Sequence, residues 1–141
     1  MDVSKINPDG TTYDCKDAAA RAEIATLQAQ GAYSTEEVNT GKRWINNKPI
    51  YRKVVNFGTL PNNAHKTVPH GISNVENFIS VTGWTKNPSD NVNFNLPFVS
   101  PGSDYCVSLD ISGDNIDVQT ARNRTSFTIS YVILEYTKTT D

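Results

Sequence analysis

The sequence predicts a mainly β protein, an antiparallel β-sandwich of jelly-roll-like type preceded by a short β-hairpin and one α-helix. Polar and apolar residues alternate with a period of two from Arg43 to the C-terminus. Asn and Thr contribute 15 residues each and Ser 11 of the 141, a composition that favours strands and turns over helices. Turn signals divide the alternating region into roughly eight short strands, as in a sandwich or barrel.

The first residues predict a small β-hairpin. Residues 3–6 alternate apolar and polar side chains, residues 7–10 read Asn-Pro-Asp-Gly, and residues 11–13 resume extended character. Pro second and Gly last in a four-residue turn is a favoured turn composition. A reversal of the chain at residues 7–10 is therefore expected.

Residues 15–30 predict the only strong helix, because they contain six alanines. Asp14 is placed to accept a backbone hydrogen bond at its start, and Gly31 is expected to end it. We divide the chain accordingly into an N-terminal anchoring and oligomerisation segment, 1–32, and a β-sandwich head domain, 33–141.

The predicted helix has a thin apolar stripe formed by Ala20, Ile24 and Leu27. About four turns of isolated helix are marginal in water, so this stripe needs a partner surface. Two partners are open. One is the body of the same domain, and the other is the same helix from neighbouring subunits, because the three residues have a/d spacing for oligomerisation.

The next segment predicts a second hairpin, with strands at 43–45 and 49–57 around a turn at 46–48. Pro, Gly and Asn clusters separate the remaining strand candidates. These candidates are residues 66–68, 75–82, 92–96, 105–111, 116–119 and 126–137.

The last of these strands has apolar residues on two faces, with Phe127, Ile129, Tyr131 and Ile133 on one and Val132, Leu134 and Tyr136 on the other. Such a strand lies centrally between two packed layers or carries its outer face into a subunit interface. Both arrangements favour an oligomer.

Charge and motif content exclude several function classes. The 13 basic and 15 acidic residues give a net charge of -2, and no Lys/Arg cluster is longer than two residues, so we expect no nucleic-acid partner. No apolar run approaches the roughly 20 residues that span a bilayer, and the first residues lack signal-peptide character. Glycine-rich phosphate loops, nucleophile elbows and metalloprotease helices are missing from the sequence, so we expect neither an enzyme nor a cofactor.

Possible metal ligands occur in two places. His65 and His70 lie in a segment of strand and turn character without accompanying Cys or carboxylates, and three aspartates surround one predicted turn. Ordinary loop and turn chemistry explains both groups better than a metal or calcium site.

A candidate receptor site lies around Trp84, which we expect at the junction of a strand and an Asn- and Asp-rich loop. An exposed ring flanked by amides is how proteins hold sugars, by stacking on the pyranose while amides bind its hydroxyls. The candidate glycan-binding residues are Trp84, Lys86, Asp90 and Asn91, which share this predicted loop region. Burial of the ring in the core or in an interface is the competing interpretation.

Several short motifs occur in a characteristic order: YSTEE from Tyr33, WI from Trp44, KPIYRK from Lys48, LPNN from Leu60, HGI from His70 and LEYTKTTD from Leu134. In this order the region 33–141 resembles a module found repeatedly at the ends of bacteriophage and prophage tail-fibre or head-fibre proteins. DGTTYD from Asp9 and DAAAR from Asp17 resemble segments that precede fibre domains.

The resemblance implies a virion structural protein, made in the host bacterial cytoplasm and exposed on the particle. It implies an N-terminal segment that joins other virion proteins and a distal β-domain that is a homotrimer and contacts the host surface. The candidate site around Trp84 makes a glycan the expected receptor. Trimerisation would bury the helix stripe and the second face of the last strand.

Two other functions remain open from the sequence. A carbohydrate-binding module of a secreted bacterial protein would bind sugar as a monomer. A purely structural decoration protein of the capsid, neck or tail would have no receptor and would bind its partner through residues before Tyr33.

Overall fold

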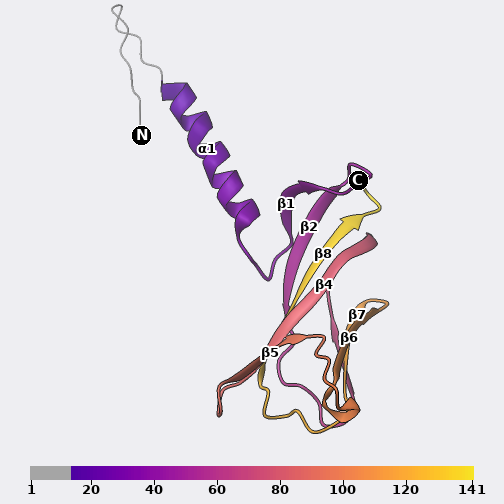
Figure 1. Cartoon of the computed structure of the whole chain (residues 1–141). Coiled ribbons are helices and arrows are strands. Elements are labelled where there is room, and N and C mark those ends of the chain that lie inside the picture. The colour runs from indigo at the N-terminus through magenta and orange to yellow at the C-terminus, as the bar shows by residue number, and fades with distance from the viewer. Residues whose placement is uncertain (1–13) are drawn as a thin grey trace, which may run out of the picture. The chain divides into compact units, whose positions relative to one another are not determined.

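A computed structural model of the chain describes residues 14–141, so the predicted hairpin at 3–13 lies outside the described residues. The chain divides between Ala32 and Tyr33 into two compact units. We describe the helix of the first unit and the β-domain of the second, Tyr33–Asp141, separately (Figure 1).

The helix α1 spans Asp14–Gly31 and ends at the glycine, as its alanine-rich sequence predicts. All side chains from residue 18 to residue 29 are exposed. Ile24 is 55% exposed and Leu27 59% exposed, and Ala20 lies one turn before Ile24 on the same stripe. The two largest apolar side chains of the helix therefore remain available for contact.

The β-domain contains eight described strands in two antiparallel sheets. The five-stranded sheet has the order β1 (Val38–Arg43), β2 (Pro49–Asn56), β8 (Ile129–Lys138), β4 (Val75–Asn87) and β5 (Val92–Leu96). The three-stranded sheet has the order β3 (His65–Pro69), β7 (Asn115–Thr120) and β6 (Val107–Ser112). The prediction of a mainly β sandwich preceded by a helix is confirmed.

The jelly-roll-like character lies in two nested strand pairs. β2 pairs with β8 in the larger sheet, and β3 pairs with β7 in the smaller one. The chain thus changes sheet four times, after β2, β3, β5 and β7. Hairpins β1–β2, β4–β5 and β6–β7 complete the two layers (Figure 1).

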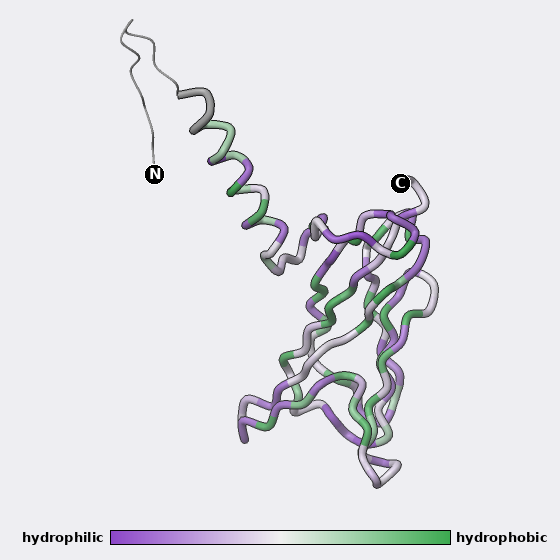
Figure 2. The backbone as a smooth tube through the Cα atoms, turned by 45° about the horizontal axis from the view of Figure 1, so that its top comes forward, coloured by the Kyte–Doolittle hydropathy of each residue, from purple (hydrophilic) through white to green (hydrophobic). Residues whose placement is uncertain are grey.

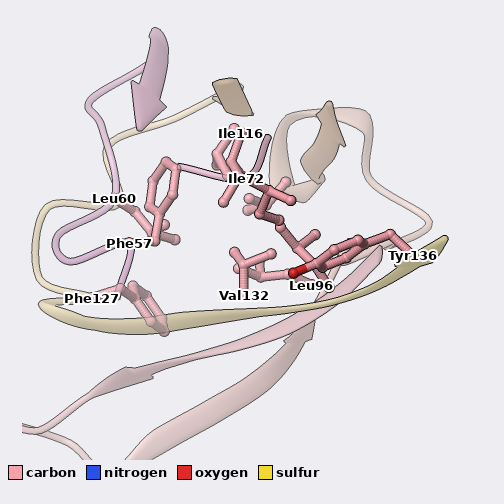
Figure 3. Close-up of a cluster of buried hydrophobic side chains, with 11 residues drawn as sticks. Phe57, Leu60, Ile72, Leu96, Ile116, Phe127, Val132 and Tyr136 are labelled. Atoms are coloured by element: carbon pink, nitrogen blue, oxygen red, sulfur yellow. The ribbon is translucent and has the colours of Figure 1, made fainter. Parts of the chain in front are cut away.

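A single hydrophobic core fills the space between the sheets (Figure 3). Hydrophobic and hydrophilic residues alternate along the strands (Figure 2), which is what one buried face per strand requires. The core is formed by Phe57, Leu60, Ile72, Leu96, Val107, Ile116, Val118, Phe127, Val132, Leu134 and Tyr136.

The first strand of the hairpin corrects one prediction. The expected strand at 43–45 is wrong, because β1 already ends at Arg43 and residues 44–48 form the turn. The Trp44 backbone N–H donates to the Lys48 carbonyl at 2.9 Å, and Asn47 has a φ of 68°. β1 itself is irregular, with Gly41 at φ 75° in a register shift, which hides its strand character in the sequence.

Other strand ends differ from prediction by smaller amounts. β4 continues five residues beyond the expected Thr82 and ends at Asn87. β8 begins at Ile129 rather than residue 126, and a short 3-10 helix, Ser103–Tyr105, precedes β6. Sequence periodicity therefore located all of these strands but not their ends.

β8 is the central strand of the larger sheet, and its two faces differ. Ser130, Val132, Leu134 and Tyr136 are fully buried towards the core. On the opposite, outer face Ile129 is 37% exposed, while Tyr131 and Ile133 are half-buried. Phe127, expected to share a face with Ile129, Tyr131 and Ile133, instead lies before the strand and is buried in the core.

Candidate functional site

The structure separates the four predicted receptor residues into two pairs. Trp84 and Lys86 lie within β4, two residues apart and therefore on the same face. Asp90 and Asn91 lie in the turn between β4 and β5. The prediction that all four share a loop is wrong, because the strand continues through Gly83 to Asn87.

The turn uses its own polar residues. The Asp90 carboxylate accepts a hydrogen bond from the Val92 backbone N–H at 3.1 Å, and Asn91 has a φ of 60°. Asn and Asp are favoured for such local hydrogen bonds and for left-handed backbone. Asp90 and Asn91 therefore have a structural role in the hairpin, whereas Trp84 and Lys86 remain candidates for binding.

The register of the larger sheet places Trp84 in a row of four residues on the outer face. Asn56 of β2 pairs with Tyr131 of β8, Tyr131 pairs with Trp84 of β4, and Trp84 pairs with Asn95 of β5. Residues paired in this way point to the same side of a sheet. We call Asn56, Tyr131, Trp84 and Asn95 the outer-face row.

The two aromatic residues of this row pack against each other. The ring centroids of Trp84 and Tyr131 are 5.3 Å apart with an angle of 35° between the planes. With Tyr33, Val54 and Ile133 they line an open hollow of about 380 Å³. Tyr33 is 68% exposed, so the hollow has an aromatic rim as well as an aromatic floor.

The polar side chains around the aromatic pair have no hydrogen-bond or ion-pair partner among the described residues. Asn56 and Asn95 are exposed, and within the described part of the chain neither amide side chain makes a hydrogen bond. Lys86 is half-buried and forms no ion pair with any described residue. The surface thus combines partly exposed rings with amide and ammonium groups that are free to bind a ligand.

Tyr131, Asn56 and Asn95 were not identified as site residues from the sequence. Their side chains become neighbours of Trp84 only through strand register, which sequence periodicity does not give. The available signal was that the last strand is apolar on both faces, one of which includes Tyr131.

The segment that follows the helix is fixed to the β-domain at the edge of the hollow. The Ser34 carbonyl accepts the Val54 backbone N–H at 2.9 Å, and the Arg52 guanidinium lies 4.4 Å from the centre of the Tyr33 ring. Further along, the Glu37 carboxylate accepts the Tyr136 hydroxyl at 2.6 Å and pairs with Lys138 at 2.7 Å. Tyr33 is therefore held beside the outer face.

Two tyrosines at this anchor have altered acidity. Burial, and next the hydrogen bond to the Glu37 carboxylate, raise the pKa of Tyr136 far above its usual value of 10.0. A hydrogen bond to Asp141, and next burial, raise the pKa of Tyr51. Both phenols are held neutral, as hydrogen-bond donors to carboxylates must be.

A larger hollow of about 740 Å³ lies at the loop between β3 and β4. Its most conspicuous residue, His70, is buried, accepts the Ile72 backbone N–H on Nδ1 at 3.0 Å and donates from Nε2 to the Gly113 carbonyl at 3.2 Å. The Glu76 carboxylate at its rim pairs with Lys48 at 3.0 Å. These groups hold loops together, which makes the outer face the stronger candidate.

The other expected ligands are also explained locally. His65 Nδ1 lies 3.1 Å from the Asp117 carboxylate across the β3–β7 pair. Among residues 14–141 no three His, Cys, Asp or Glu side chains are grouped as a metal site requires. In the same range, the one helix is too polar to cross a bilayer.

Comparisons with known proteins give no family for this chain. No family model matches it, and no curated protein or solved structure does.

Proposed function

We propose that this chain is a bacteriophage virion structural protein, a trimeric fibre or decoration head domain that attaches the particle to a host-surface glycan. The proposal is supported by the ordered motifs that resemble fibre-end modules, from YSTEE at Tyr33 to LEYTKTTD at Leu134. It is also supported by a sandwich domain that follows a helix suited to self-association. In the proposed virion, the segment before Tyr33 contacts other structural proteins.

The observation that carries the proposal is the exposure of Ile24 and Leu27 on α1, at 55% and 59%. Full burial of an aliphatic side chain of this size is worth about 1.5–3 kcal/mol. Three parallel copies of the helix can bury Ala20, Ile24 and Leu27 against one another, which one helix cannot do.

Trimerisation would also strengthen attachment. A single open site on a flat sheet binds sugar weakly, but three linked sites rebind at high effective concentration. The outer-face row of each subunit would then contribute to one multivalent contact.

Light scattering on the full chain tests the assembly. We expect a mass of about 47 kDa, three times the 15.6 kDa of one chain. Ile24→Ser with Leu27→Ser should yield monomer, because both substitutions make the stripe polar. The matched control, Ala25→Ser with Ala29→Ser, changes the opposite side of α1 and should remain trimeric.

A monomer in all variants would contradict the trimer. In that case a carbohydrate-binding module, which works as a monomer, is favoured by the aromatic pair Trp84 and Tyr131. A trimer without affinity for sugars would instead favour a purely structural decoration protein.

A further inference from the structure

We propose that the outer-face row binds an extended oligosaccharide of pyranose sugars that carry carboxylate groups, with Trp84 and Tyr131 stacking on the rings and Lys86 binding the carboxylate. This inference deepens the attachment role proposed above by naming the surface and the class of ligand. The binding residues are Asn56, Trp84, Lys86, Asn95 and Tyr131.

The position of the two rings favours a ligand over a core role. The buried core lies on the other face of the sheet, where Gly83, Thr85 and Val132 alternate with Trp84 and Tyr131. On the outer face only Tyr33, Val54 and Ile133 border the hollow, and Tyr33 is itself largely exposed. Partly exposed aromatic rings are suited to stacking on the apolar face of a sugar.

The flanking amides supply the polar half of such a site. Asn56 and Asn95 end the row on its two sides, and neither side chain has a hydrogen-bond partner within the described residues. Each amide offers both a donor and an acceptor, the combination that adjacent sugar hydroxyls require. An apolar protein partner would leave these amides buried and unpaired, which costs about 1–3 kcal/mol for each group.

The length of the row favours an oligosaccharide over a single sugar. Neighbouring strands lie about 4.8 Å apart, so the three steps from Asn56 to Asn95 span about 14 Å. The surface is an open hollow on a sheet, so an extended chain can lie across the strands.

The positive charge of Lys86 favours acidic sugars over neutral ones. Lys86 is two residues from Trp84 on the same face of β4, and its neighbours across the strands are Asn93 and Ile129, neither of them charged. It has no ion-pair partner among the described residues. An unpaired ammonium beside a stacking ring complements a carboxylate on the sugar.

Titration of the full chain with oligosaccharides tests the inference. The probe is oligogalacturonate, and the matched control ligand is its methyl ester, which has the same rings without charge. Oligosaccharides containing glucuronate and sialate complete the acidic panel. The chain has two tryptophans, so Trp44→Phe leaves Trp84 as the only one. The tryptophan fluorescence of this variant then reports binding at Trp84.

We expect saturable binding of at least one acidic probe, and weaker binding of its uncharged counterpart. Lys86→Gln should remove most of that preference, about fivefold or less for an exposed charge pair. Asn95→Ala should weaken both ligands about two- to tenfold. By calorimetry, Trp84→Ala should abolish binding, whereas Trp44→Ala at the exposed hairpin turn should not change it.

Three outcomes of the titration would overturn the inference. They are the absence of binding across the acidic panel, binding that survives Trp84→Ala, and a methyl ester that binds as tightly as the acid. A Trp84→Ala chain that folds but loses its assembled mass would assign this face to a second copy instead, which also overturns it. Light scattering on the same samples distinguishes failure of this inference from failure of the proposed trimer. A trimer that binds no acidic sugar would support the assembly and contradict the binding site. A monomer that binds acidic sugar would support the binding site and contradict the assembly.

Discussion

The two faces of β8 share one backbone and the same neighbouring strands, yet their environments differ. Val132, Leu134 and Tyr136 are fully buried under the three-stranded sheet, whereas Ile129 on the other face is 37% exposed. Both faces are apolar in sequence, so hydrophobicity alone does not separate them. What covers a face decides its role, and only the inner face is covered by a second layer of the sandwich.

This difference assigns stability to the inner face and binding to the outer face. Substitutions on alternate residues of the same strand should therefore have separable effects. The inner ones should change the free energy of unfolding, and the outer ones should change ligand binding with little effect on folding.

The largest difference in the free energy of unfolding is expected between substitutions at Leu134 and at its sequence neighbour Ile133. Leu134→Ala should lower the free energy of unfolding by about 2–5 kcal/mol, because it leaves a cavity in the core. Ile133→Ala on the half-buried outer face should cost about 1 kcal/mol. Denaturant unfolding of both variants measures the difference, and equal losses would mean that the outer face is covered as fully as the inner one.

Gly83 tests the same comparison, because it is buried on the inner face of β4 next to Trp84 on the outer face. A Cβ at this position would lie 2.6 Å from the Tyr131 carbonyl oxygen, which is a backbone atom and cannot turn away. We expect Gly83→Ala to destabilise the domain by about 1–3 kcal/mol in thermal or chemical unfolding. Thr82→Ala, one residue earlier on the outer face, is the control and should stay within about 0.5 kcal/mol of the natural chain.

The inner face also contains one buried polar pair. The Thr85 and Ser130 hydroxyl oxygens are 2.8 Å apart, and both residues are fully buried. Thr85→Val should cost about 1–3 kcal/mol, since it leaves the Ser130 hydroxyl without its side-chain partner. Adding Ser130→Ala should recover part of that loss in a double-mutant cycle, and additive losses would contradict the coupling.

Alkaline pH should weaken the anchor of residues 33–37 through Tyr136. Its pKa is higher in the folded than in the unfolded state, so the stability from the neutral phenol is complete below about pH 10 and is lost above it. We expect a loss of about 1 kcal/mol by pH 11, with Tyr51 adding in the same direction. Tyr136→Phe should have a shallower loss between pH 10 and 11, and an unchanged slope would contradict this role.

The sequence predicted those features of the fold that depend on local pattern. Alternation located the strands, and the alanine-rich segment located α1. Two strands differ from prediction near a glycine. Gly41 lies at the register shift of β1, and β4 continues through Gly83, where the absent side chain permits close approach to the Tyr131 carbonyl.

The candidate site was only partly predictable for a different reason. Trp84 and Lys86 were identified because they were expected to share one Asn- and Asp-rich loop region with Asp90 and Asn91. Their partners Asn56 and Tyr131 come from strands distant in sequence and meet Trp84 through register alone. Two register shifts within β4 further separate the pairing from any simple alternation.

Quenching of Trp84 fluorescence in the full chain with Trp44→Phe tests most directly whether the outer face stays open. We expect acrylamide to quench Trp84 efficiently in the assembled protein, and an acidic oligosaccharide to reduce that quenching. A Trp84 that is shielded in the absence of any ligand would contradict an open outer face.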